Sequence, residues 1–182
     1  MTPFFILGRP RSRTAWLANF LTVTPFSFCL HEGLADFGGS VRLLKRKLDA
    51  ASGEAVGNAD TGLIHVVDEL LEAFPDSRFV VVCGTKRAWH LFASENYIND
   101  ALVRATDESF AYTVATLRAH PRALFIGRDE LDLPLKAQEL WTHCLGSADL
   151  FDRARFEMLC GLNVQADNEA LLYRIRQGCP HL

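Results

Sequence analysis

The residues best suited to chemistry lie near the start of the chain, in the segment GRPRSRT, residues 8–14. Three arginines occupy five consecutive positions there: Arg9, Arg11 and Arg13. A guanidinium group offers planar N–H donors that match the oxygens of phosphate or sulfate groups. Ser12 and Thr14 add hydroxyls that could bond a phosphate or cap a helix. The segment is therefore predicted to bind an anion.

A candidate proton acceptor follows in the tripeptide His31-Glu32-Gly33. A carboxylate or an imidazole can take a proton from a reacting hydroxyl. Glu32 is the first candidate for such a base and His31 the second. The alternative is that Glu32 is a solvent-facing turn residue and that His31 packs beneath a helix.

The elements that position these residues can be read from apolar runs. Strong runs at 4–7, 26–30, 78–84 and 123–127, and a weaker one at 54–58, are typical of strands covered on both faces. Helices are expected between and after them, at 39–51, 62–74, 99–119, 134–145, 151–160 and 167–177. The alternation predicts an α/β fold of three layers, with a parallel sheet of four to five strands flanked by helices. One domain over residues 1–182 is expected.

In such a fold the arginine-rich segment connects the first strand to a helix. Free N–H groups and the helix dipole favour an anion at this position. A Walker A loop, G-x-x-x-x-G-K-[ST], would need glycine at Arg13, lysine at Thr14 and a hydroxyl at Ala15. All three requirements fail, so the usual mode of Mg-nucleotide binding is not predicted. The alternative is that the arginines are solvated charges and that Ser12 is a helix cap.

Composition narrows the classes of partner. The 182 residues include 19 Lys and Arg against 22 Asp and Glu, for a net charge of −3, which gives no support for nucleic-acid or anionic-membrane binding. No apolar stretch approaches the roughly 20 residues of a membrane span, and the first ten residues do not resemble a signal peptide. The five cysteines are scattered without a C-x-x-C pair, which argues against disulfides and zinc. A cytoplasmic protein without a metal is expected.

The segment GRPRSRTAWL resembles the 5′-phosphosulfate-binding loop of sulfotransferases, commonly written P-[KR]-S-G-T-T-W-L. The positions that match are Pro10, Arg11, Ser12, Thr14, Trp16 and Leu17. Arg13 replaces the glycine of the pattern and Ala15 its second threonine. These enzymes use 3′-phosphoadenosine 5′-phosphosulfate (PAPS) as donor, on a fold like that of P-loop NTPases.

The resemblance implies a role for each part of this loop. It implies that Arg11 contacts the transferring sulfuryl group, and that Ser12, Thr14 and the loop amides hold the 5′-phosphate. Donor binding is expected from Arg9, Pro10, Arg11, Ser12, Arg13, Thr14, Ala15 and Trp16. In the protein-tyrosine sulfotransferase branch, the catalytic glutamate also follows the second strand. Glu32, 21 residues after Arg11, has a similar placement.

A second block, residues 70–97, resembles the family's segment that binds the 3′-phosphate. Its first half, FPDSRF at 74–79, matches, whereas the later arginine and serine positions do not align directly. A shifted alignment pairs Lys86 or Arg87 with Ser94, which would lie on the helix after the third strong strand. Ordinary surface charges are the alternative. The glycine-rich R-K-G-x-x-G-D-W loop of cytosolic sulfotransferases is absent.

The expected function is transfer of a sulfuryl group from PAPS, a small-molecule nucleotide donor, to a hydroxyl acceptor that the sequence does not identify. Two alternatives remain open. One is a degenerate P-loop kinase or phosphotransferase. The other is a non-catalytic module that binds a nucleotide or another anion.

Overall fold

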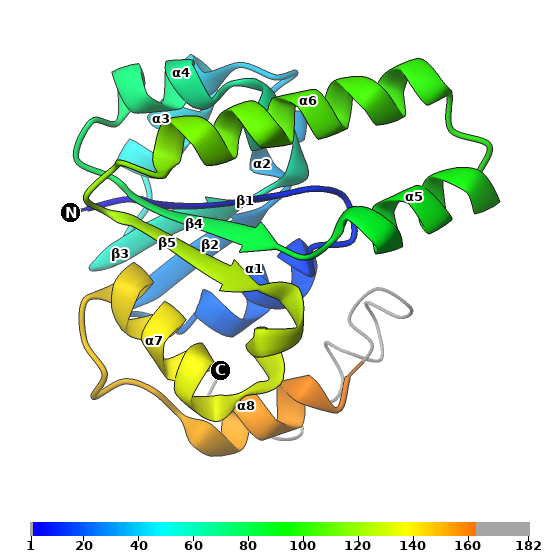
Figure 1. Cartoon of the computed structure of the whole chain (residues 1–182). Helices are drawn as coiled ribbons and strands as arrows, with labels where there is room; N and C mark the ends of the chain where they lie inside the picture. Colours follow the sequence, from blue (N-terminus) through cyan, green and yellow to red (C-terminus); the bar gives the residue numbers. More distant parts are fainter. Residues whose placement is uncertain (1, 163–182) are drawn as a thin grey trace.

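A computed structural model describes residues 2–162; the helix expected at 167–177 and Cys179 lie outside this range. Five strands form one parallel sheet in the order β2-β3-β1-β4-β5 (Figure 1). Their bounds are β1 Phe4–Gly8, β2 Ser27–His31, β3 Ala55–Ala59, β4 Arg78–Cys83 and β5 Ala123–Gly127. The predicted parallel sheet is confirmed, and the weak run at 54–58 is a strand.

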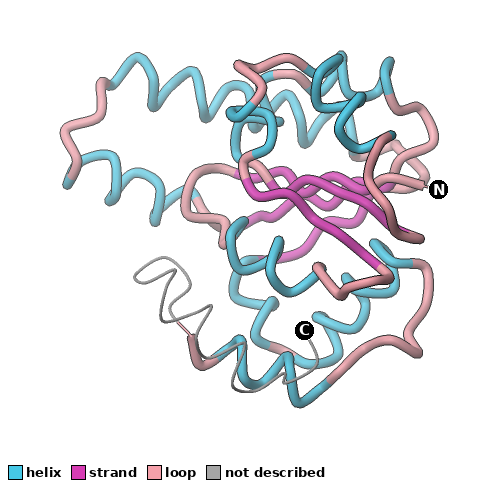
Figure 2. Tube along the Cα trace, turned by 180° about the vertical axis from the view of Figure 1, so that it is seen from behind, coloured by secondary structure: helices cyan, strands magenta, loops and turns pink. Residues whose placement is uncertain are grey.

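Helices cover both faces of the sheet, as Figures 1 and 2 show. One face packs against α1 (Thr14–Leu21), α7 (Pro134–Leu145) and α8 (Arg153–Cys160). The other packs against α2 (Gly33–Asp36), α3 (Val41–Asp49), the 3₁₀ helix η1 (Thr61–His65), α4 (Val67–Ala73) and α6 (Asp100–Leu117). Along β1, Phe4 and Ile6 enter the first core, whereas Phe5 and Leu7 enter the second. This alternation explains why the strand is apolar at every position.

Strand β3 carries a weak sequence signal because small and polar residues fill its central positions. Every residue of β3 is buried. A Cβ added at Gly57 would collide with the ring of Phe4, so the aromatic ring of β1 occupies the space over this backbone. Asn58 is fully buried beside it. The strand therefore depends on its neighbours more than on its own propensity.

Most helix predictions hold to within two residues, and their ends have clear physical causes. Helix α7 begins at Pro134 and ends before Gly146, whose φ of 85° suits a glycine C-cap. Side-chain oxygens of Ser40, Asn99 and Asp152 cap α3, α6 and α8 by accepting backbone N–H bonds.

The helix expected at 62–74 is the main error. The chain forms η1 and then α4, with a break at Val66, whose φ is −131°. The Ile64 carbonyl accepts the hydroxyl of Thr113 on α6, at 3.1 Å, instead of an intrahelical bond. A tertiary contact thus interrupts an apolar stripe that is continuous in the sequence.

Two helices begin where neighbouring central strands end. Strand β1 pairs with β4, and α1 follows β1 while α5 (Lys86–Glu95) follows β4. Helices α5 and α6 extend beyond the carboxyl edge of the sheet (Figure 1). The 3₁₀ helix η2 (Arg128–Asp132) follows β5 at the same edge. The carboxyl edge, where α/β sheets form ligand crevices, therefore carries the residues considered next.

Candidate functional site

The loop between β1 and α1 has an unusual backbone. Arg11 and Arg13 have φ values of 75° and 61°, in the left-handed region that disfavours side chains. A Cβ at Gly8 would collide with the Ser12 side chain, which is fully buried and donates its hydroxyl proton to the Arg9 carbonyl. The loop therefore folds tightly back on the end of β1. Strained positions of this kind concentrate at functional sites.

The first turn of α1 presents unpaired amides at the end of this loop. Arg13 is the N-cap residue, and its side chain makes no capping bond. Within residues 2–162, the N–H groups of Thr14, Ala15 and Trp16 have no backbone or side-chain acceptor. These amides and the helix dipole create positive potential at the start of α1. An anion could satisfy the free donors.

Arg9 packs against α6. Its Nε lies 2.6 Å from Asp107 Oδ1, and its guanidinium lies 4.0 Å from the centre of the Phe110 ring. His90 of α5 contacts the other Asp107 oxygen at 2.7 Å. Burial alone would raise the pKa of Asp107, but hydrogen bonds and positive charge from His90 and Arg9 lower it overall. Arg9 thus joins the loop to both helices of the α5–α6 pair.

Arg13 is held on the opposite side of the loop. Its Nη1 lies 2.6 Å from Asp132 Oδ1 of η2, and its guanidinium lies 4.4 Å from the ring centre of Trp16. Trp16 is itself fixed, because its Nε1 donates to the Leu159 carbonyl at 2.9 Å. These contacts offset the unfavourable backbone conformation of Arg13, which costs about 1–2 kcal/mol for a residue with a side chain. Arg13 therefore ties the loop to η2 and α1.

Arg11 differs from the other two arginines. Its side chain is exposed and has no carboxylate partner within residues 2–162. Its guanidinium lies 5.2 Å from the ring centre of Phe92 on α5, and its carbonyl accepts Arg128 Nε at 3.2 Å. Among the three loop arginines, Arg11 is the one whose donors are available for an anion.

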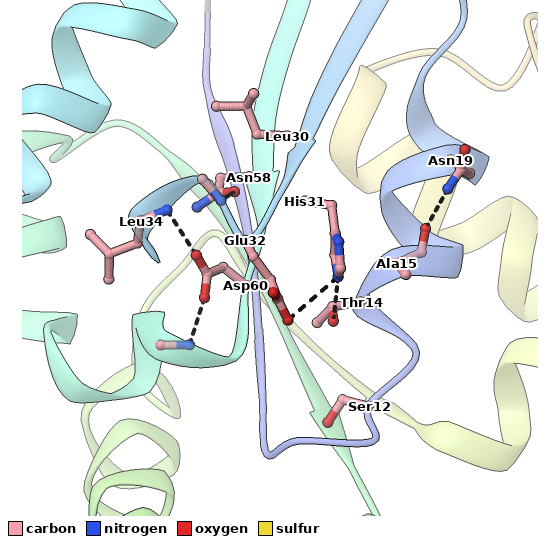
Figure 3. A network of polar contacts seen from close by, with 12 residues as sticks. Ser12, Thr14, Ala15, Asn19, Leu30, His31, Glu32, Leu34, Asn58 and Asp60 are labelled. Atoms are coloured by element: carbon pink, nitrogen blue, oxygen red, sulfur yellow. Dashed lines mark hydrogen bonds and ion pairs between the residues drawn. The ribbon is translucent and has the colours of Figure 1, made fainter. Parts of the chain in front are cut away.

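The candidate bases lie next to α1 (Figure 3). Thr14 Oγ1 and His31 Nε2 are 3.4 Å apart, and His31 Nε2 lies 3.7 Å from Glu32 Oε1. The Glu32 side chain is half exposed, and its φ of 55° again falls in the left-handed region. The structure therefore brings His31 and Glu32 to the first residue of the helix that follows the arginine loop.

The turn between β4 and α5 holds the residues expected to contact a 3′-phosphate. Gly84 supplies a φ of 78°, and Thr85 is the N-cap residue of α5. Thr85 is fully buried, and its hydroxyl has no partner in the described chain. Lys86 and Arg87 are exposed in the first turn, and the exposed Ser94 lies about two turns further along the helix.

Sequence reasoning did not identify the groups that brace the loop. Asp107 and Asp132 are 98 and 119 residues from their arginine partners, and no sequence spacing announces such pairs. Arg128 also lies at the loop, through its bond to the Arg11 carbonyl. Its position directly after an apolar strand is the one signal that could have identified it.

The rest of the described chain, within residues 2–162, offers few alternative sites. In this range no group of three or more His, Cys, Asp or Glu could hold a metal ion, and no helix could cross a membrane. The four cysteines in the same range are free. A cavity of about 320 Å³ lies between the η1–α4 segment and α6, and contains none of the arginine-loop residues.

No known protein family matches the sequence, and no curated protein matches it either. The fold is similar to the crystal structure of a sulfotransferase from Alicyclobacillus acidocaldarius, with a TM-score of 0.57. The similarity covers 87% of this chain and 89% of that one, at 13% sequence identity. The chain therefore has a sulfotransferase-like α/β fold, as the sequence predicted.

Proposed function

We propose that this protein is a sulfotransferase that moves a sulfuryl group from PAPS to the hydroxyl of a small-molecule acceptor. One observation carries the proposal. Arg11, in the loop before α1, has no carboxylate partner within residues 2–162, while the Glu32 carboxylate is linked through His31 to Thr14, the first residue of α1. In this proposal the loop before α1 supplies the anion-binding group, and the turn after β2 supplies the proton acceptor beside the first residue of α1.

The described residues fit the donor at two points. The free amides of residues 14–16 and Arg11 suit a 5′-phosphosulfate, and Lys86 with Arg87 at the start of α5 suits a 3′-phosphate. The two helices follow strands that pair directly, with Gly8 beside Val82. A nucleotide with phosphates at both ribose positions could therefore contact both turns. Ser94 stays a predicted ligand of the 3′-phosphate.

Each reacting group has a defined task in this proposal. The acceptor oxygen forms a bond to sulfur while the bond from sulfur to the bridging phosphate oxygen breaks. Glu32 takes the acceptor proton, with His31 as the second candidate. Arg11 and the α1 amides stabilise the negative charge that develops on the bridging oxygen. PAPS supplies the sulfuryl group and leaves as 3′,5′-ADP.

Other predicted donor-binding residues have contacts that favour a supporting role. Arg9 and Arg13 are paired with carboxylates, and the Ser12 hydroxyl bonds to the loop backbone. Pro10 lies in the tight turn, and Trp16 packs against Phe20 with ring centres 4.9 Å apart. We propose that these side chains shape the loop, so that Arg11 and the amides of Thr14, Ala15 and Trp16 bind the donor.

Calorimetry with 3′,5′-ADP and a sulfuryl-transfer assay with PAPS test the proposal together. The expected result is metal-independent binding of 3′,5′-ADP, and turnover that depends on Glu32. Absence of 3′,5′-ADP binding to the wild-type protein would contradict the proposal. Stabilisation by Mg-ATP but not by 3′,5′-ADP would instead indicate a kinase or phosphotransferase. Tight binding without turnover for any hydroxyl acceptor would indicate a non-catalytic nucleotide-binding module.

A further inference from the structure

The turn that carries Glu32 is attached to β3 by three successive amides. Glu32 N–H donates to the Ala59 carbonyl at 3.1 Å, and Gly33 N–H donates to Asn58 Oδ1 at 3.1 Å. Leu34 N–H donates to Asp60 Oδ2 at 2.8 Å. Asn58, Ala59 and Asp60, at the end of β3 and directly after it, thus accept three neighbouring amides of the turn that follows β2. Figure 3 shows the bond between Leu34 and Asp60.

The side chains that make two of these bonds are deeply buried. Asn58 is 0% exposed and Asp60 is 2% exposed. Asp60 also accepts Gly62 N–H at 2.7 Å with its second oxygen, so it caps η1 and holds the Glu32 turn at once. Buried polar groups usually persist only when their hydrogen bonds have a specific purpose.

The buried Asn58 side chain also has an energetic cost. Its Nδ2 group is buried and has no acceptor within residues 2–162. A purely apolar residue would avoid this unsatisfied donor, but it could not accept the Gly33 amide. The space is also closely fitted, because a Cβ at Gly33 would lie 2.9 Å from Leu30 Cδ1 and 3.0 Å from Asn58 Oδ1. A side chain at position 33 would therefore require Leu30 and Asn58 to shift.

We infer that Asn58 and Asp60 are positioning residues, whose side-chain oxygens hold the turn at residues 32–34 so that the Glu32 carboxylate faces the start of α1. Glu32 has a left-handed backbone that a glutamate does not prefer, so the turn needs external support to keep it. The hydrogen bonds donated by the amides of residues 32–34 supply that support. The inference rests on the proposed function, because it concerns the base of that reaction.

The first test compares Asn58→Leu with wild type, using phenol and 4-nitrophenol as acceptor probes. The leucine keeps a similar size but removes the acceptor for the Gly33 amide. Turnover of phenol, which needs a base, is expected to fall roughly 10- to 100-fold. Turnover of 4-nitrophenol, assayed where it is already ionised, is expected to fall much less, and binding of 3′,5′-ADP is expected to stay unchanged. Equal losses with both acceptors would overturn the inference.

Two further variants separate positioning from general damage. Asn58→Asp retains an oxygen that can accept the Gly33 amide, so it should restore phenol turnover. Asn99→Leu is the control, because Asn99 Oδ1 also accepts a backbone amide, Ala101 N–H at 2.7 Å, at the exposed start of α6. This variant should leave the ratio of phenol turnover to 4-nitrophenol turnover unchanged. A shift in that ratio for Asn99→Leu, or no recovery in Asn58→Asp, would count against positioning by Asn58.

Amide hydrogen exchange supplies a readout that needs no turnover. The Gly33 amide should exchange roughly 10-fold faster in Asn58→Leu than in wild type, while amides of α7 keep their rates. If wild type binds no 3′,5′-ADP, the proposed function fails, and the exchange data alone decide whether Asn58 holds the turn. Unchanged exchange at Gly33 would overturn the inference even if the protein is a sulfotransferase.

Discussion

The two turns that follow β1 and β4 differ in how they are held. After β1, two arginines adopt left-handed backbone conformations, and two carboxylates, Asp107 and Asp132, fix the loop from both sides. After β4, Gly84 supplies the left-handed residue, and neither Lys86 nor Arg87 has a carboxylate partner in the described chain.

The difference suggests that the two turns would contribute differently to binding of the proposed donor. The first turn is held by ion pairs that need no ligand, which suits a group whose reacting atoms must be aligned. The second turn has exposed cations at a helix N-terminus, without carboxylate partners within residues 2–162, and such cations can attract a phosphate without setting its geometry. The turn between β1 and α1 is therefore the fixed turn, and the turn between β4 and α5 is the open turn. Substitutions in each turn test this contrast.

The largest effect is expected at Arg11. Arg11→Ala should lower kcat for sulfuryl transfer roughly 100- to 1,000-fold, because it removes the charge that stabilises the leaving phosphate. The melting temperature should change little, since the side chain is exposed and unpaired within residues 2–162. Arg46→Ala, at an exposed position on α3, is the matched control and should retain full activity. A stable Arg11→Ala enzyme with normal kcat would exclude this role.

Breaking the support of the fixed turn should cost stability. Asp107→Asn leaves the buried Arg9 without its carboxylate and should lower the free energy of unfolding by about 2 kcal/mol, measured in urea. The loss should be accompanied by weaker binding of 3′,5′-ADP, because both the loop and α5 meet at Asp107.

Asp107 should also make the free energy of unfolding depend on pH in a defined direction. The pKa of Asp107 is lowered from 3.8 in the folded protein, so the unfolded chain binds the proton more readily. Its stabilising contribution is therefore present above about pH 4 and is lost as the pH falls through the folded pKa. In Asp107→Asn, the free energy of unfolding measured in urea should therefore fall less as the pH is lowered through the acid range than it does in wild type. An identical acid dependence in both proteins would contradict it.

The cations of the open turn should affect the affinity for the 3′-phosphate of the nucleotide and not for its 5′-phosphate. Replacing both Lys86 and Arg87 by alanine should weaken 3′,5′-ADP binding roughly 10-fold, while adenosine 5′-monophosphate binding stays unchanged. Calorimetry with both nucleotides measures the ratio, and Lys136→Ala on the exposed side of α7 serves as control. Equal weakening of both nucleotides would show that these cations do not distinguish the 3′-phosphate.

The smallest effect concerns the backbone at Arg13. Arg13→Ala loses the contacts to Asp132 and Trp16 but keeps the left-handed strain, whereas Arg13→Gly loses the contacts and relieves the strain. The glycine variant should therefore be more stable than the alanine variant by about 1 kcal/mol in urea unfolding. Equal stability of the two variants would mean that position 13 relaxes out of the left-handed region in solution.

The sequence predicted the parts of the fold that depend on local patterns. Apolar runs identified the strands, and their parallel arrangement placed Glu32 and the arginine loop at one edge of the sheet, since carboxyl ends of parallel strands meet there. The helix at 62–74 was wrong because the bond between Thr113 and the Ile64 carbonyl comes from α6, beyond the reach of any periodicity.

The roles of the three arginines could not be separated from the sequence. Arg9, Arg11 and Arg13 have the same chemistry and the same spacing, yet two are paired and one is available. Which arginine is paired depends on acidic residues far along the chain. It also depends on a left-handed backbone at Arg11 and Arg13, which is uncommon for residues other than glycine. The support of the Glu32 turn by Asn58 was equally hidden, because an asparagine in a weak strand carries no motif.

The attachment of residues 32–34 to β3 also bears on how the edge strand finds its partner. Strand β2 has five residues and pairs with β3 alone in the sheet. A slip of one residue would turn Cys29 out of the core and expose it in place of Phe28, and would separate the Gly33 and Leu34 amides from Asn58 and Asp60. The bonds that aim the carboxylate therefore also penalise mispairing of this strand. A chain with the wrong register would lose the bonds that hold Glu32 beside α1, so under the proposed function only correctly paired molecules would place the proposed base.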